Sequence, residues 1–123
     1  MVDPKRVLVV DDSRVARMMI KLYILNTFAD WTVFEAQSGE QSIAEIESIR
    51  PDVVTMDVNM QGMSGLDAAE QLLQRFPKLC VILITANVQE SSRKRAEEIG
   101  AHFLQKPVTE AAIKAALEAF LAK

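Results

Sequence analysis

Apolar runs of strand length alternate with helix-period segments along the whole chain. Most of the runs are apolar at consecutive positions, which is typical of strands covered on both faces of a parallel sheet. We therefore predict one parallel sheet, in which the second strand is weaker and alternating and the fifth is short. Its strands are Arg6–Asp11, Trp31–Ala36, Asp52–Asp57, Leu79–Thr85 and His102–Gln105.

Four of the intervening segments carry a stripe of apolar residues at helical spacing. Such stripes predict the faces that helices bury, and their Met and Phe residues are expected to belong to the core. The stripes are Val15, Met19 and Leu22; Ile43, Ile46 and Ile49; Leu66, Ala69 and Leu73; and Ile113, Leu117, Phe120 and Leu121.

The fourth helix, expected over Val88–Ile99, has a poorer inner face. That face consists of Val88, Ser92, Ala96 and Ile99, which offer little apolar area. Because burial contributes about 25 cal/mol per Å² of apolar surface, we expect this helix to be the least firmly held.

Five strands alternating with five helices predict an α/β fold. Right-handed crossovers favour a three-layer doubly wound (βα)5 arrangement, and the flavodoxin-like strand order 2-1-3-4-5 is a common one. In that order strands 1 and 3 are neighbours at the topological switch point, where the order of the strands reverses. Ligands of such sheets bind there, outside the carboxyl ends of the strands. The length of 123 residues suits a single domain over residues 1–123.

Composition narrows the classes of function. The net charge of −3 and the pI near 5.2 argue against a direct nucleic-acid partner. No apolar run approaches a membrane helix in length, and the N-terminus is not a signal peptide, so no membrane insertion is expected. Cys80 lies inside LCVILIT and is expected to be a buried, inert thiol. We therefore expect a soluble, cytoplasmic protein.

Polar residues gather where the predicted strands end. Asp11 and Asp12 end the first strand, Asp57 the third and Thr85 the fourth, and Lys106 follows the fifth. Two unit charges 4 Å apart repel by about 4 kcal/mol at an effective dielectric constant of 20. A hard divalent cation removes this repulsion, and Mg²⁺ binds through a few carboxylate oxygens. We therefore predict a metal site at this edge.

Each of these residues also has a simpler explanation. Asp12 or Ser13 could cap the first helix, and Asp57 could cap a loop. Thr85 could be structural, and Lys106 could be an ordinary solvated lysine. Their joint occurrence at successive strand ends argues against these separate explanations. The stretch DDSRVA also argues against a flavodoxin-type site, because its acids repel phosphate unless a metal intervenes.

Four motifs carry a family resemblance. They stand in the order VLVVDDS, VVTMDVNMQGMSGLD, ILITA and FLQKP. Together they resemble the response-regulator receiver domain, the CheY-like phosphoacceptor of two-component signalling. The resemblance runs from Arg6 to the last helix. DDSRVARMMIK and VTMD resemble the stand-alone chemotaxis members more narrowly, which implies a single receiver domain without an output domain.

The resemblance assigns the acceptor and the metal ligands. Asp57 matches the phosphoacceptor aspartate. Asp12 matches a direct Mg²⁺ ligand, and Asp11 matches an acid that binds Mg²⁺ through water. Asn59 matches the position whose backbone carbonyl completes the metal site. Gln61 departs from the family, which usually has proline there, and this puts the stiffness of the loop in doubt.

The resemblance also assigns the switch. Lys106 matches the lysine that pairs with the phosphoryl group, and the bond between Lys106 and Pro107 matches a cis peptide. Thr85 matches the switch hydroxyl, and Phe103 the switch aromatic residue.

The implied function is signalling rather than turnover of an external substrate. The donor is a sensor histidine kinase or a phosphotransfer protein, and the domain catalyses only its own phosphorylation and dephosphorylation. A downstream protein is expected on the face of helix 4, strand 5 and helix 5, with the chain a monomer or a phosphorylation-dependent dimer. The basic run Arg93–Arg95 lies on or near that face, although Glu97 and Glu98 could simply balance it.

Three other functions stay open at this stage. A degenerate receiver would bind a partner or dimerise without being phosphorylated. The presence of all the residues that match the family's site argues against this function; they are Asp11, Asp12, Asp57, Thr85 and Lys106. A haloacid-dehalogenase-type phosphatase needs a second acid two residues after its nucleophile, where this chain has Asn59. A DNA-binding regulator needs a second domain, so the chain would have to be excised from a longer protein.

Overall fold

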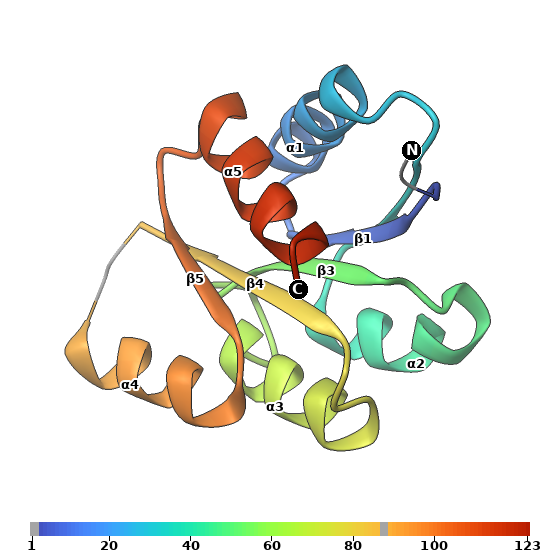
Figure 1. Cartoon of the computed structure of the whole chain (residues 1–123). Coiled ribbons are helices and arrows are strands. Elements are labelled where there is room, and N and C mark those ends of the chain that lie inside the picture. The colour runs from blue at the N-terminus through green and yellow to red at the C-terminus, as the bar shows by residue number, and fades with distance from the viewer. Residues whose placement is uncertain (1–2, 87–88) are drawn as a thin grey trace.

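The computed structural model describes residues 3–86 and 89–123. They form one parallel sheet with the strand order β2-β1-β3-β4-β5, so the predicted topology is confirmed (Figure 1). The strands agree with the predicted runs to within one residue at each end. They are β1 (Arg6–Val10), β2 (Thr32–Ala36), β3 (Val53–Asp57), β4 (Cys80–Thr85) and β5 (His102–Gln105).

Helices cover both faces of the sheet, which confirms the three-layer architecture. One face carries α1 (Arg14–Thr27) and α5 (Glu110–Leu121), as Figure 1 shows. The other carries α2 (Gly39–Ile49), α3 (Gly65–Arg75) and α4 (Glu90–Ile99). Every helix except α4 begins after a Ser or Thr whose side chain accepts a hydrogen bond from a backbone N–H of the first turn.

Two apolar cores hold the layers together, one on each face of the sheet. Val7, Val9 and Ile82 point toward α1 and α5, whereas Leu8 and Leu83 point toward the other three helices. Alternate residues of each strand thus enter opposite cores. The two central strands β3 and β4 are buried along their whole length, which explains why, apart from Thr55, they are apolar up to their last residues.

The predicted inner face of α1 was wrong. Val15 and Leu22 are 64% and 51% exposed, and Met19 is 39% exposed. The helix instead buries Ile20 and Ile24 against the sheet. Because α1 is apolar over much of its circumference, it carries two possible stripes, and periodicity alone does not show which one meets the core.

Helix α4 has the sparse packing that its sequence suggests. Ala96 is the only residue that it buries among its described residues, Glu90–Ile99, and the predicted start at Val88 lies outside the described residues. Glu97 and Glu98 were expected to balance the positive charge of the basic run, but Arg95 pairs with other acids. Its guanidinium contacts α3 instead, at 2.6 Å from Asp67 Oδ1 and 3.7 Å from a carboxylate oxygen of Glu70. The basic run is therefore not a uniform solvent-facing patch.

A search of the described residues for membrane-spanning helices finds none with the required length and apolar character.

Candidate functional site

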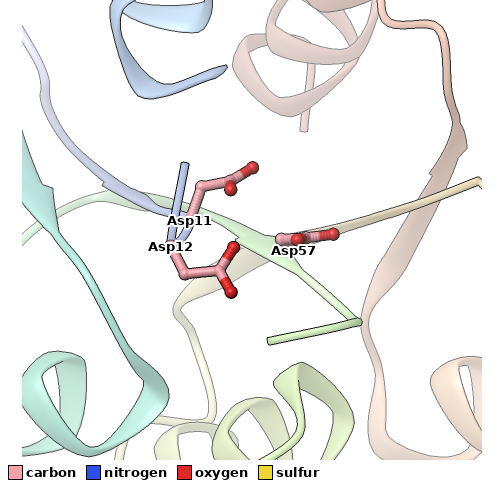
Figure 2. Close-up of side chains that lie close together, drawn as sticks. All are labelled: Asp11, Asp12 and Asp57. Carbon is pink, nitrogen blue, oxygen red and sulfur yellow. The ribbon is translucent and has the colours of Figure 1, made fainter. Parts of the chain in front are cut away.

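Three carboxylates meet at the carboxyl ends of β1 and β3. Asp11 and Asp12 follow β1, and Asp57 is the last residue of the neighbouring strand β3. One carboxylate oxygen from each lies within 4.8 Å of the others. Figure 2 shows the three side chains close together at the ends of the two strands. Asp11 and Asp57 are buried, at 2% and 4% exposure, whereas Asp12 is exposed. The predicted acidic cluster is therefore formed.

The loop that carries Asp11 is held by the start of α1. The Ser13 N–H donates a hydrogen bond to Asp11 Oδ1 at 2.9 Å, and the Ser13 hydroxyl caps α1. The buried Arg17 donates from its guanidinium to the Asp11 carbonyl oxygen at 2.7 Å and to Glu35 on β2 at 3.0 Å. Sequence reasoning missed Arg17. Its only signal was its place on the same helix face as Ile20 and Ile24, where a charged residue needs a partner.

Lys106 brings a positive charge to the cluster. Its Nζ lies 3.2 Å from Asp57 Oδ1 and 4.0 Å from Asp11 Oδ2. The Lys106 N–H donates to the Thr85 carbonyl oxygen at 2.8 Å, which ties the loop after β5 to the end of β4. The peptide bond between Lys106 and Pro107 is cis. Lys106 thus lies beside the carboxylates of Asp57 and Asp11, and its backbone is bonded to Thr85.

Thr85 and Asn59 are joined by their side chains. Thr85 is buried, and the Asn59 side-chain N–H donates to its hydroxyl at 3.3 Å. The family resemblance concerned only the backbone carbonyl of Asn59, so this contact was not anticipated. Phe103 lies on β5 opposite Leu83, partly buried against the core under α2, α3 and α4.

Burial sets the protonation of the cluster. It raises the pKa of both Asp11 and Asp57 above the usual aspartate value, while Lys106 partly offsets the rise at Asp57. Among the described residues, the Lys106 ammonium at 3.2 Å is the one cation paired with the buried Asp57 Oδ1, and this oxygen has no further hydrogen-bond donor. Carboxylate oxygens that repel one another and lack a full set of donors suit a hard divalent cation. The three acids therefore fit a Mg²⁺ ion.

These pKa shifts predict how stability depends on pH without metal. A carboxyl group with a raised folded-state pKa contributes stability below its unfolded pKa, and this is lost as the pH rises through the folded value. In EDTA, Asp57→Asn should therefore be more stable than the parent at pH 7, with a smaller loss of stability between pH 4 and pH 7. Urea unfolding across that range measures both effects. An Asp57→Asn variant less stable than the parent at pH 7 in EDTA would contradict the predicted sign.

Comparison of sequences places the chain among known proteins. The family described as "Response regulator receiver domain" matches residues 7–118. The chain is 37% identical to the chemotaxis protein CheY of Thermotoga maritima, over 84% of this chain and 86% of that protein. It is 42% identical to a protein-glutamate methylesterase/protein-glutamine glutaminase of Pyrococcus abyssi, but there the match covers only 28% of the longer protein.

Solved structures show the same fold. A response regulator described as putative, from Chloroflexus aurantiacus, is 27% identical, with a TM-score of 0.86 over 98% of this chain and all of that one. A CheY-like receiver domain from Methanospirillum hungatei has a TM-score of 0.89 at 21% identity, over 98% of this chain and 95% of that one, and shows the fold alone.

Proposed function

The chain belongs to the response regulator receiver family, and the receiver domain is a non-enzymatic signalling module. On this premise we propose that Asp57 is its phosphoacceptor. The observation that carries the proposal is the buried Asp57 carboxylate, with Lys106 Nζ 3.2 Å away and two further acids beside it. The donor is a histidine kinase or a phosphotransfer protein.

In the proposed reaction an Asp57 oxygen attacks the phosphorus of a phosphohistidine. An O–P bond forms as the N–P bond breaks, and the histidine leaves. Lys106 favours the ionised nucleophile and pairs with a phosphoryl oxygen, so this chain contributes position and charge to an in-line transfer. Asp12, Asp57 and the Asn59 carbonyl would hold Mg²⁺, with Asp11 bound through water, and the ion would supply positive charge to neutralise the phosphoryl oxygens. Water later hydrolyses the acyl phosphate.

The readout is a shift between two conformations of the same domain. The phosphoryl group gives the Thr85 hydroxyl a new acceptor for its O–H, while the Asn59 side chain donates to the oxygen of the same hydroxyl. As the end of β4 follows Thr85 inward, Phe103 moves from partly buried to buried. The poorly packed α4 moves at the lowest cost, which changes the α4, β5 and α5 face offered to a target protein.

The biological setting is proposed from the relatives. The CheY proteins of Thermotoga maritima and Listeria monocytogenes are covered over 86% and 95% of their lengths. We assign the chain to the same kind of role, a single receiver domain at residues 1–123, acting in the cytoplasm through protein contacts in chemotaxis. The Pyrococcus relative shows that similar domains also occur within longer proteins.

Exposed apolar residues beside the site suggest where the donor docks. Val15, Met18, Met19 and Leu22 form what we call the α1 face, and they are between 39% and 64% exposed. A groove of about 470 Å³ includes Met19 of this face in its lining, together with Asp11 and Lys106. Helix α1 contains Arg and Lys but no acid. These features fit one occupant, a phosphohistidine-bearing helix with an apolar face and acidic flanks.

Charge on the α1 face should block this donor but not a small one. Met18→Glu with Leu22→Glu is expected to slow transfer from a phosphorylated kinase at least about tenfold, since buried interface anchors contribute about 2 kcal/mol or more. Acetyl phosphate should still phosphorylate the variant at the parent rate. Ala44→Glu with Ser48→Glu on α2 adds the same charges at the same spacing and serves as the control. Equal slowing by both pairs would exclude specific docking on α1.

Beryllium fluoride, a stable phosphoryl mimic, tests the acceptor and the switch together. With Mg²⁺ it should bind the parent and shift the NMR signals of Thr85 and Phe103. Asp57→Asn should not bind it. Thr85→Ala should bind it without the shift at Phe103. Binding to Asp57→Asn would contradict the proposal.

A further inference from the structure

The loop after β3 contacts the acidic cluster through a backbone amide. The Gln61 N–H donates to Asp12 Oδ2 at 3.4 Å. Proline, the usual family residue at this position, has no N–H to donate. The departure at Gln61 therefore adds a contact to one of the candidate metal ligands.

The same turn is held from the side by α2. Gly62 has a φ of 79°, in the left-handed region that favours glycine. The Met63 N–H donates to Glu40 Oε2 at 3.4 Å, and Glu40 lies in the first turn of α2. A Cβ at Gly62 would lie only 2.7 Å from that oxygen. Glu40 thus fixes the turn from which the Gln61 amide reaches Asp12.

We propose that the Gln61 amide is a positioning group for the metal site. It holds Oδ2 of Asp12 and leaves Oδ1 to bind the cation, so the carboxylate is already oriented when Mg²⁺ arrives. The inference rests on the proposed function. Loss of partners that hydrogen-bond to metal ligands typically weakens binding by 10- to 100-fold. Because this contact is long and exposed, we expect a loss of about three- to tenfold, at or below the lower end of that range.

Two substitutions at residue 61 separate the amide from the side chain. Gln61→Pro removes the N–H, and Gln61→Ala keeps it. Gln61 is not among the residues with positive φ, and it precedes a glycine that is, the pattern of a turn that favours proline at the position before the glycine. Calorimetric titration with Mg²⁺ should give a dissociation constant about three- to tenfold higher for Gln61→Pro than for the parent. Gln61→Ala should match the parent. Urea midpoints in EDTA show whether both variants are folded.

A second pair acts on the turn without changing its backbone. Glu40→Ala and Glu40→Gln remove the same charge, but only Glu40→Gln keeps an oxygen to accept from Met63. The proposal predicts weaker Mg²⁺ binding for Glu40→Ala than for Glu40→Gln. This pair keeps the test valid even if proline unfolds the loop.

The outcomes separate this inference from the proposed function. A weaker Mg²⁺ affinity confined to Gln61→Pro and Glu40→Ala supports the inference. Equal affinities across all variants, equal weakening by Gln61→Ala and Gln61→Pro, or tighter binding by Gln61→Pro would overturn it and leave the phosphoacceptor intact. No Mg²⁺ binding by the parent would overturn the proposed function as well.

Discussion

Lys106→Met is expected to slow phosphorylation of the chain by acetyl phosphate about 100- to 1,000-fold, the usual effect of removing one group that stabilises transition-state charge. Lys106 Nζ lies 3.2 Å from Asp57 Oδ1. Its loss removes a partner of the phosphoryl oxygens. It also raises the pKa of Asp57 further, because Lys106 now lowers that pKa against the effect of burial. Less of the nucleophile is then ionised, so the variant should recover part of its rate as the pH rises.

A matched control separates this local effect from a change in net charge. Lys114 is exposed on α5, and Lys114→Met removes the same charge away from the cluster. Intact-mass time courses at saturating Mg²⁺ should show the parent rate for Lys114→Met. A Lys106→Met rate within a factor of two of the parent would show that Lys106 does not act on the reacting atoms.

Gly65→Ala should lower the free energy of unfolding by about 3 kcal/mol, the largest loss of stability expected for any of these variants. This value is at the upper end of the usual cost of overpacking a buried site. A Cβ at Gly65 would lie 2.1 Å from the Asp57 carbonyl oxygen and 2.9 Å from Val58 Cα. These are backbone atoms, so no side chain can rotate away. The Gly65 N–H also donates to the Val58 carbonyl oxygen at 2.9 Å. Helix α3 would have to move away from the strand that carries the acceptor.

Gly100→Ala is the comparison for this variant. Gly100 has a φ of 85°, and within the described part of the chain no atom lies within 4 Å of an added Cβ. Its cost should be only that of a left-handed alanine, about 1 kcal/mol. Urea unfolding of both variants measures the difference. Equal costs would mean that the start of α3 can shift freely away from Asp57.

The strands and the acidic cluster could be predicted from sequence for one shared physical reason. Strands buried on both faces must be continuously apolar, so polar residues such as Asp57 and Thr85 are conspicuous where these strands end. Parallel pairing then brings the ends of neighbouring strands to one edge. Right-handed crossovers restrict the possible topologies without side-chain detail, and the order 2-1-3-4-5 is a common one among doubly wound sheets.

The errors arose where the choice depended on three-dimensional packing. Helix α1 has two apolar stripes, and only contact with Val7 and Val9 of the sheet selects the one with Ile20 and Ile24. Arg95 could pair along its own helix or across to α3, and the sequence contains acids for both. Its pairing with Asp67 depends on how the two helices pack.

The contacts around the site were the least predictable part. Arg17 reaches the Asp11 carbonyl, and Asn59 reaches the Thr85 hydroxyl across 26 residues of sequence. The position of Arg17 on the helix face of Ile20 and Ile24 indicates burial but not its partner, and Asn59 has no periodic signal. Each partner becomes a neighbour only after the strands have paired. Such contacts need coordinates, although the charges and hydroxyls that they serve are visible in the sequence.

The most direct measurement of the central claim is the intact mass of the chain after incubation with acetyl phosphate. Parent and Asp57→Asn are compared, each with Mg²⁺ and with EDTA. The account predicts one added phosphoryl group in the parent with Mg²⁺, and none in the other three samples. The same adduct on Asp57→Asn, or failure of the parent to accept either acetyl phosphate or beryllium fluoride with Mg²⁺, would contradict it.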